Sequence, residues 1–183
     1  MTPQRDSFGT SLQRSPATMN LQRFLDAQNP VYDQALEELK AGQKQSHWIW
    51  FVFPQHRGLG SSQRAQFYGI ECLDEARAYQ KHPVLGPRLH ECTTAVLRHT
   101  QKSASQILGV PDDLKFFSCM TLFSEAAPEE LVFRLALQAF FNGSKDPETL
   151  RLCGLTSRKS SVTRTAAAGP QHDLSAGPLL HMR

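Results

Sequence analysis

Five prolines divide the middle of this 183-residue chain into short segments. Each proline lies at or near the start of a stretch whose apolar residues recur every three or four positions, as they do on one face of an α-helix. Proline is tolerated in the first turn of a helix, because the N–H that it lacks would have no helical partner there. The pattern predicts five helix starts: Asn29-Pro30, Gly86-Pro87, Val110-Pro111, Ala127-Pro128 and Asp146-Pro147.

The apolar stripes between the prolines are those of short helices. A first stripe begins at Leu21 and a second runs from Tyr32 to Leu39, and we expect these two helices to form a hairpin. Further stripes run from Leu85 to Val96 and from Val132 to Phe140. The pair Asn142-Gly143 is expected to end the last of these, since both residues accept the left-handed conformation that often follows a helix.

The segment from His47 to Phe53 is ambiguous, because its aromatic and β-branched residues also suit a strand. No other segment of the chain looks like a pairing partner, and a lone buried strand would leave its backbone groups without hydrogen bonds. We therefore predict a short buried helix, capped by Ser46 and ended by Pro54. A strand would require two chains to pair. The fold class predicted is all-α, with about six to eight short helices.

Charge and aromatic content separate a central body from two tails. Residues 20–154 hold 15 of the 16 aromatic residues, whereas 1–19 and 155–183 are rich in Ser, Thr, Gly, Pro and Ala. Segments of that composition bury too little apolar area to offset the entropy lost on ordering, so both tails are predicted to be disordered. We expect one all-α domain over residues 20–154, and a natural start at Met19, just before the first stripe.

Composition excludes several classes of function. The chain has a net charge of +3, but residues 20–154 hold 14 basic and 15 acidic side chains, which argues against binding of nucleic acid by the body. A run of about 18 apolar residues, which would indicate a membrane helix, is absent, as is the apolar core of a secretory signal. These features predict a cytoplasmic protein that does not bind membranes.

The sequence gives no indication of a metal or cofactor. The histidines lack the spacing of metal ligands on one helix, and neither a P-loop nor a dinucleotide fingerprint is present. We therefore expect no cofactor. The cysteines are 20 or more residues apart and form no C-x-x-C pair, so we predict reduced, mostly buried thiols at Cys72, Cys92, Cys119 and Cys153.

Two stretches are richer in aromatic and polar residues than ordinary core segments. The first is KQSHWIWFVFPQ, followed by RGLGSS and FYGI, and the second is DDLKFFSCMTLF. With HPVLGPRL between them, the chain resembles the bacterial domain-of-unknown-function family numbered 1810 over about residues 20–153. The resemblance implies an all-helical fold, and it implies no catalytic residue, ligand or activity.

In the first stretch, His47 is a candidate general acid or base, because an aromatic surrounding and a nearby charge could tune its pKa. The alternative is an ordinary hydrogen-bonded histidine. Trp48 and Trp50 could stack on a flat ligand or could fill core volume. The glycine turn that ends in Ser61 and Ser62 could bind an anion or could only cap the next helix.

In the second stretch, Lys115, Ser118 and Cys119 lie at helical spacing on one face, which is unusual for either core or surface. Lys115 could neutralise a phosphate or carboxylate, while Asp112 or Asp113 could orient His47. The alternative is a capping aspartate pair with a salt-bridged lysine.

Together these residues predict a pocket that binds a small anionic or nucleotide-like molecule. The catalytic candidates are His47 and Lys115, and any reaction is expected to be metal-free hydrolysis or transfer, for instance at a glycosidic bond. The predicted ligand-binding residues are Lys44, Ser46, Trp48, Trp50, Gln55, Arg57, Gly58, Gly60, Ser61, Tyr68, Ser118 and Thr121. The alternative function is an interaction module, in which a partly exposed patch over residues 47–53 mediates homodimerisation or partner docking.

Overall fold

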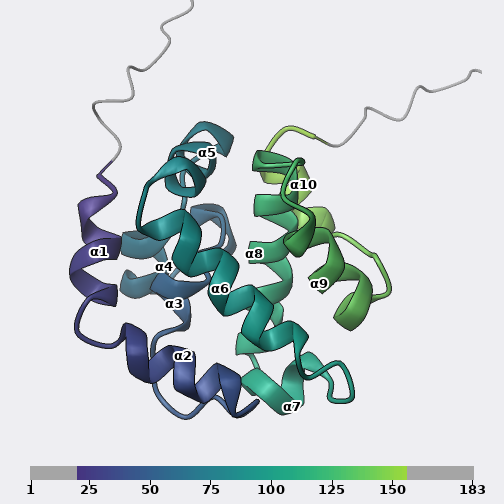
Figure 1. The fold of residues 1–183 in the computed structure, drawn as a ribbon. Helices are drawn as coiled ribbons and strands as arrows, with labels where there is room; N and C mark the ends of the chain where they lie inside the picture. Colours follow the sequence, from purple (N-terminus) through teal and green to yellow (C-terminus); the bar gives the residue numbers. More distant parts are fainter. Residues whose placement is uncertain (1–19, 156–183) are drawn as a thin grey trace, which may run out of the picture.

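The computed structural model describes residues 20–155, and all their regular secondary structure is helical (Figure 1). This confirms the all-α prediction. The helices of this part of the chain are α1 (Gln22–Gln28), α2 (Tyr32–Lys40), α3 (Ile49–Val52), the 3-10 helix η2 (Arg57–Leu59), α4 (Gln63–Tyr68), α5 (Leu73–Lys81), α6 (Leu85–Leu97), α7 (Ala104–Leu108), α8 (Asp112–Ala126), α9 (Leu131–Phe141) and α10 (Pro147–Leu152).

Residues 20–155 thus form ten α-helices, more than the six to eight expected, because α3, α4, α7 and α10 have only four to six residues. The predicted disordered tails and the expected start at Met19 lie outside the described residues, apart from position 155.

Each of the five predicted helix starts is confirmed to within three residues. Pro147 is the first residue of α10, and the Asp146 side chain before it accepts hydrogen bonds from the N–H groups of Glu148 and Thr149. At the other end of α9, Asn142 adopts the left-handed conformation with φ 54° and ends the helix as predicted. Local signals in the sequence therefore set these boundaries.

Helix α8 lies at the centre of the fold and packs against α3, α5, α7, α9 and α10. Every residue from Ser118 to Ser124 is buried, on all sides of the helix, which is the pattern of a helix with neighbours all round. Phe116, Met120 and Phe123 are fully buried, as the sequence predicts. The N-terminal turns of α8 reach the surface, where Leu114 is exposed and Lys115 half-buried.

The HPVLGPRL stretch forms the start of α6 and has a structural explanation. The Nδ1 atom of His82 accepts hydrogen bonds from the N–H groups of Val84 and Leu85, which satisfies donors at the helix start. A side chain at Gly86 would place its Cβ 2.0 Å from the carbonyl oxygen of Gln80, so only glycine allows α5 and α6 to approach this closely.

The ambiguous segment is helical, and the strand alternative is therefore wrong. Its helix α3 begins at Ile49, and Ser46 does not cap it as predicted. The Ser46 hydroxyl instead donates to Glu38 at 2.6 Å, and the Trp48 indole N–H donates to the same carboxylate at 2.8 Å. Trp48, Ile49, Val52 and Phe53 are buried inside this chain, so the partly exposed patch required by the interaction-module alternative does not exist at those four positions.

Glu38 is a buried carboxylate that fastens α2 to the loop before α3. Burial alone would raise its pKa, but hydrogen bonds from Ser46, Gln45 and Trp48 outweigh this effect and lower the pKa to about 2. Two of these bonds come from the backbone N–H groups of Gln45 and Ser46, at 2.8 and 3.0 Å. The aromatic stretch is thus anchored by an acidic residue seven to ten positions earlier in the chain.

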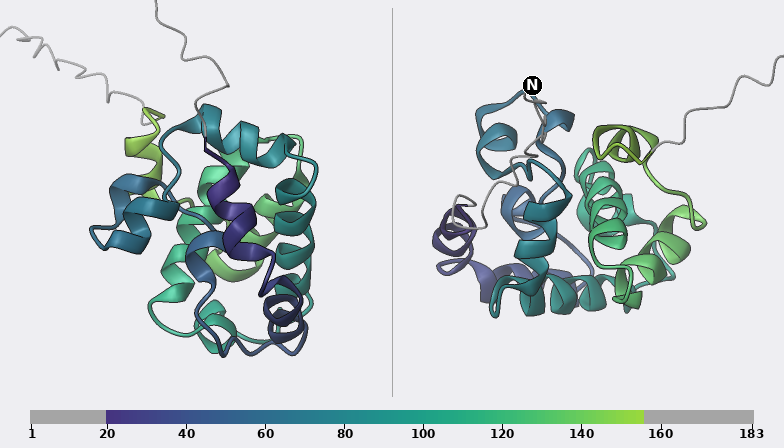
Figure 2. Two further views of the ribbon diagram at one scale, coloured as in Figure 1. Left: turned by 90° about the vertical axis from the view of Figure 1, so that its left-hand side faces the viewer. Right: turned by 90° about the horizontal axis from the view of Figure 1, so that it is seen from above.

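Helices α4 and α10 are far apart in the sequence, and the 3-10 helix η2 contacts both of them. In the left view of Figure 2 both are on the side away from α6. η2, which precedes α4, packs against α10. This arrangement brings the glycine-rich loop next to the N-terminal half of α8.

Candidate functional site

A cavity of about 580 Å³ is bounded by three parts of the chain. The first is α3 with the segment after it, the second is α4 with the loop before it, and the third is the N-terminal half of α8. One wall is apolar and another carries charged and hydroxyl groups. The lining residues are Trp50, Gln55, Leu59, Gly60, Ser61, Ser62, Ala65, Pro111, Leu114, Lys115, Phe117, Ser118 and Asp146.

Two cations lie against the half-buried Trp50. The Lys115 Nζ atom is 4.5 Å from the centroid of the indole ring, and the Arg64 guanidinium carbon is 5.1 Å from it. Both distances fall within the range of a cation–π interaction. Arg64 forms no ion pair with a carboxylate of residues 20–155, so its charge is held beside the ring without being neutralised.

Asp112 bridges Lys115 to Lys44, whose Nζ atom lies 5.3 Å from the centroid of the Trp48 ring. Its carboxylate is 2.6 Å from the Nζ atoms of both Lys44 and Lys115, and the three side chains are between 9% and 19% exposed. Burial would raise the pKa of Asp112, but the hydrogen bonds and charges of Lys115 and Lys44 outweigh it and hold the pKa below its ordinary value. One carboxylate shared by two ammonium groups leaves one positive charge in excess.

The prediction that Asp112 or Asp113 orients His47 is wrong. Asp112 is occupied by the two lysines, and the Asp113 carboxylate accepts from the backbone N–H of Leu114. His47 is exposed and forms no hydrogen bond or ion pair with either aspartate in the described part of the chain.

Ser118 and Asp146 form the polar side of the cavity. The Ser118 hydroxyl is within hydrogen-bonding distance of two acceptors: the Asp146 Oδ2 atom at 2.8 Å and the carbonyl oxygen of Leu114 at 3.1 Å. Thr121 is fully buried, and its hydroxyl oxygen accepts from the backbone N–H of Asp146 at 2.9 Å. Thr121 therefore fixes the position of Asp146 without lining the cavity.

The GLGSS loop forms the edge of the cavity. Ser62 caps α4, since its hydroxyl oxygen accepts from the N–H of Ala65 at 3.2 Å. A Cβ on Gly60 would lie 2.6 Å from the Cβ of Ala65, so glycine is required where the loop approaches the helix. Gln55 is held next to this loop because its carbonyl oxygen accepts from the Ile70 N–H at 3.0 Å, within an isolated β-bridge.

The structure brings five of the twelve predicted ligand-binding residues to the cavity. Those that line it are Trp50, Gln55, Gly60, Ser61 and Ser118, together with the catalytic candidate Lys115. Tyr68 lines a small adjoining space of about 10 Å³ that Trp50 and Lys115 also reach. Lys44 and Thr121 do not line the cavity, and they contact Asp112 and Asp146 respectively.

The other predicted residues lie elsewhere. Ser46 and Trp48 surround Glu38, and Trp48 is only 1% exposed. His47 does not line the cavity. Gly58 faces Leu152 of α10, with an added Cβ only 2.9 Å from that side chain. Ser46, His47 and Trp48 precede the first residue of α3, whereas Gly58 belongs to η2, beyond α3.

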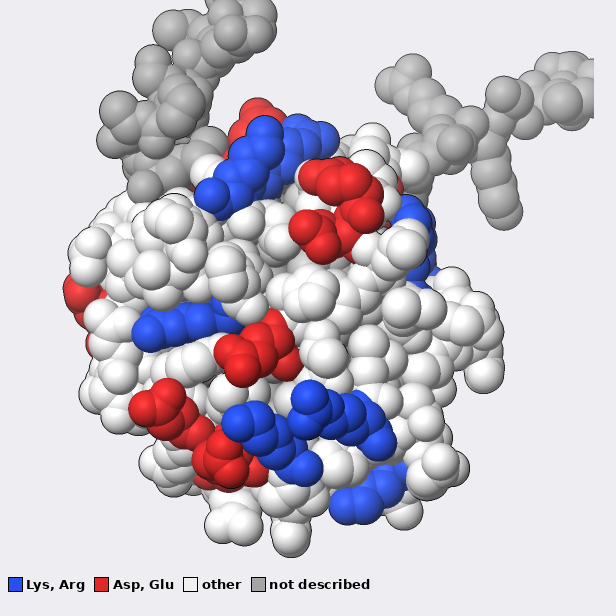
Figure 3. Space-filling model, in the orientation of Figure 1, with Lys and Arg blue, Asp and Glu red and all other residues white. Residues whose placement is uncertain are grey.

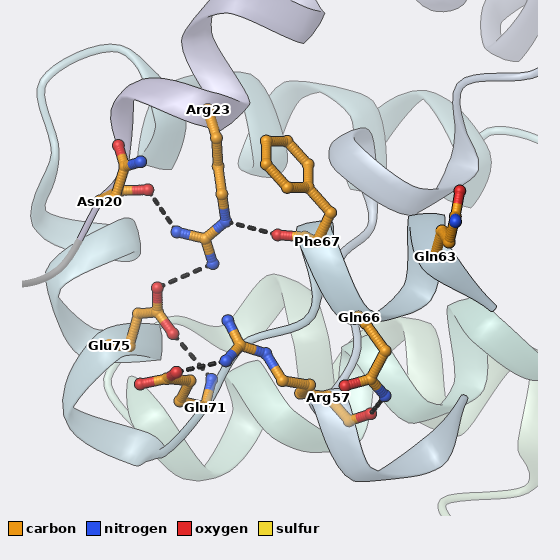
Figure 4. A pocket seen from close by; sticks show the side chains of 8 residues that line it. All are labelled: Asn20, Arg23, Arg57, Gln63, Gln66, Phe67, Glu71 and Glu75. Carbon is orange, nitrogen blue, oxygen red and sulfur yellow. Dashed lines mark hydrogen bonds and ion pairs between the residues drawn. The ribbon is translucent and has the colours of Figure 1, made fainter. Parts of the chain in front are cut away.

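Arg57 lines a second cavity, of about 550 Å³, which Figure 4 shows from close by. There Arg57 pairs with Glu71, and the buried Arg23 pairs with the buried Glu75 at 2.8 Å. Arg23 also donates to the backbone carbonyls of Asn20, Phe67 and Gly69. The two positive and two negative charges of this cavity balance. Each of the three guanidinium nitrogens of Arg23 donates to a group of the protein itself.

Cys119 lies in the core and does not line the cavity. It is fully buried, and burial raises the pKa of its thiol well above the ordinary value, so the thiol stays protonated. Cys92 is also buried, Cys153 is half-buried and Cys72 is exposed, and all four cysteines are free. Burial is confirmed for Cys92 and Cys119 but not for Cys72 and Cys153, and the reduced state stays a prediction.

The described residues give no other site of an evident kind. Figure 3 shows basic and acidic side chains interspersed on the face that α6 crosses, without a continuous basic area. Within residues 20–155, His, Cys, Asp and Glu form no group of three that could hold a metal ion. None of the helices in this range is long and apolar enough to cross a membrane.

Sequence reasoning missed several residues of the cavity. Leu59, Pro111, Leu114 and Phe117 form its apolar wall, and Asp146 carries its carboxylate. The sequence marks Asp146 only as the start of a helix, which it also is. Its second role arises because α10 packs against α8, and local periodicity does not predict that contact.

Comparisons with known proteins give a family and a fold. The family model described as "Protein of unknown function (DUF1810)" matches residues 18–153. The crystal structure of the conserved hypothetical protein Rv1873 from Mycobacterium tuberculosis is similar to this chain, with 50% sequence identity and a TM-score of 0.74. The match covers 75% of this chain and 99% of that one. No curated protein matches the chain.

Proposed function

The chain belongs to the DUF1810 family, and we propose that its cavity beside Trp50 binds a small anionic molecule, such as a nucleotide or a sugar phosphate. The observation that carries this proposal is the excess of positive charge at the cavity and directly behind its lining. Lys44, Lys115 and Arg64 contribute three positive charges, and Asp112 neutralises one of them. Counting Asp146, the surroundings of the cavity still have an excess of one positive charge.

The shape and lining of the cavity support a small organic ligand. A volume of about 580 Å³ lies within the range of small-molecule sites. Leu59, Leu114 and Phe117 offer apolar surface to the body of a ligand, and Lys115 offers an ammonium group to its anionic part. A site with both kinds of surface suits an organic anion better than a simple inorganic one.

Any reaction at this cavity is proposed to be metal-free hydrolysis or transfer. A group that transfers a proton must lie within hydrogen-bonding reach of the substrate. His47 does not line the cavity, whereas Asp146 and Lys115 do. We therefore propose that Asp146, and not His47, exchanges a proton with the substrate. Lys115 is proposed to neutralise the anion.

The two tryptophans allow a direct test of binding. Trp50 lines the cavity while Trp48 is buried beside Glu38, so a ligand in the cavity changes the emission of Trp50. We expect a saturable change when the wild-type protein is titrated with adenosine 5′-phosphate. Lys115→Gln is expected to weaken this binding about tenfold or more, because it removes a charge-assisted contact.

Lys40→Gln is the matched control, because it makes the same change of charge on α2, where Lys40 pairs with Glu37 at the surface. It should leave the affinity unchanged. The proposal is wrong if neither adenosine 5′-phosphate nor inorganic phosphate gives a saturable change in emission or a heat of binding. It is also wrong if Lys40→Gln weakens binding as much as Lys115→Gln does.

A further inference from the structure

We propose that Asp146 and Ser118 make this cavity selective for anions that carry hydroxyl groups, of the sugar phosphate type. This inference rests on the proposed function, since it concerns the same cavity. Both residues line it together with Lys115. A carboxylate at an anion site needs an explanation, because it weakens the binding of every ligand that does not offer it a hydrogen-bond donor.

The two oxygens of Asp146 are used unequally by the protein. Oδ2 lies within hydrogen-bonding distance of three donors: the hydroxyls of Ser118 and Thr149, at 2.8 and 2.5 Å, and the Thr149 N–H at 3.3 Å. Oδ1 accepts one bond within residues 20–155, from the Glu148 N–H at 3.2 Å. A carboxylate has about four acceptor positions, so Oδ1 can take a further donor from a ligand.

The spacing of Lys115 and Ser118 along α8 gives the distance between the cationic end of the site and its hydroxyl-binding end. Lys115 and Ser118 are three residues apart, which places them about 4.5 Å apart along the helix axis and on the same face. An anionic group at Lys115 and a hydroxyl at the Ser118–Asp146 pair can therefore belong to one small molecule. A five- or six-carbon sugar phosphate has both groups at a spacing of this order.

The charge of Asp146 sets the selectivity. A hydroxyl donates a charge-assisted hydrogen bond to the carboxylate, whereas a second anionic group at the same place is repelled. The neutral groups of Gln55 and Ser61 can complete the recognition of a sugar, because they also line the cavity. The site is thus cationic at Lys115 and accepts hydroxyl donors at Asp146.

The test compares two probes that share a phosphate and differ in their hydroxyls: ribose 5-phosphate and butyl phosphate. We expect wild-type protein to bind ribose 5-phosphate at least tenfold more tightly. Asp146→Asn keeps a good helix cap and removes the charge. It should weaken the binding of ribose 5-phosphate about five- to tenfold and leave butyl phosphate unchanged or slightly tighter.

Ser118→Ala provides a second variant, with a smaller effect in the same direction. The difference between the two probes on one variant separates recognition from a purely structural effect, since a distorted cavity weakens both. Equal affinity of the wild type for the two probes, or an equal loss of both in Asp146→Asn, overturns this inference and leaves anion binding intact. If the two probes, adenosine 5′-phosphate and inorganic phosphate all fail to bind, the proposed function fails and this inference fails with it.

Discussion

The cavity beside Trp50 and the cavity beside Arg23 have similar volumes, about 580 and 550 Å³, but their charges are used differently. Beside Arg23, the charges balance, and Arg23 donates to three backbone carbonyls as well as to Glu75. Beside Trp50, Lys44 and Lys115 share Asp112. Charges that satisfy the protein's own groups hold the fold together, and in our proposal the charges in excess are available to a ligand.

The two tryptophans differ in the same way. Trp48 is buried and its indole N–H is taken by Glu38, so its polar atom serves the fold. Trp50 is half-buried at a cavity wall, with Lys115 and Arg64 against its ring. Volume and residue type alone do not distinguish a binding site from a structural one. The useful criterion is whether each polar group is already paired with another group of the same chain.

The largest effect on stability is expected at Arg23. Arg23→Met leaves the buried Glu75 carboxylate without its partner and leaves three carbonyls without a donor. Breaking a buried ion pair in this way costs about 3–5 kcal/mol. Urea denaturation at pH 7 measures the loss. A loss below about 1 kcal/mol would show that the Arg23 cavity is not structural, and the comparison between the cavities would fail.

The double variant Arg23→Met, Glu75→Leu is the control for this prediction. It removes the uncompensated charge, so part of the lost stability should return. The affinity for adenosine 5′-phosphate should stay close to that of wild type in any variant that remains folded, because both residues line the other cavity.

The next largest effect concerns Glu38. Its folded-state pKa of about 2 lies below the ordinary value of 4.5, so its contribution to stability is complete above pH 5 and is lost as the pH falls towards 2. Glu38→Gln should lose about 2–3 kcal/mol at pH 7 and should differ much less from wild type near pH 2. Urea denaturation between pH 7 and pH 2.5 tests this. A difference that does not shrink with falling pH would contradict it.

Much of the fold follows from local signals in the sequence. The prolines, the apolar stripes and Asn142 mark helix ends within a few residues, since capping and periodicity act over one or two turns. The start of α3 does not follow in this way. Ser46 looks like a cap, but Glu38 in the preceding helix takes its hydroxyl, and a tertiary hydrogen bond replaces the local one.

The candidate site was predictable only in part, for a similar reason. The sequence indicates Lys115 and Ser118 as candidates because a charge and a hydroxyl on one face of a helix rich in apolar residues are unusual. Both residues line the cavity. Asp146 comes to it only through the packing of α10 on α8. His47 and Trp50 are three residues apart, yet they are separated because the helix begins only at Ile49.

The smallest effect is expected at Arg57, and it tests which cavity holds the ligand. Arg57 pairs with Glu71 at the edge of the Arg23 cavity, where both side chains are at least one-third exposed. An ion pair with that exposure contributes about 0–1 kcal/mol, so Arg57→Gln should change the free energy of unfolding by less than about 1 kcal/mol. Its affinity for adenosine 5′-phosphate should stay within about twofold of wild type, since Arg57 does not line the Trp50 cavity. A tenfold loss in Arg57→Gln, equal to that of Lys115→Gln, would place the anion beside Arg57, because the two variants remove one positive charge each from different cavities.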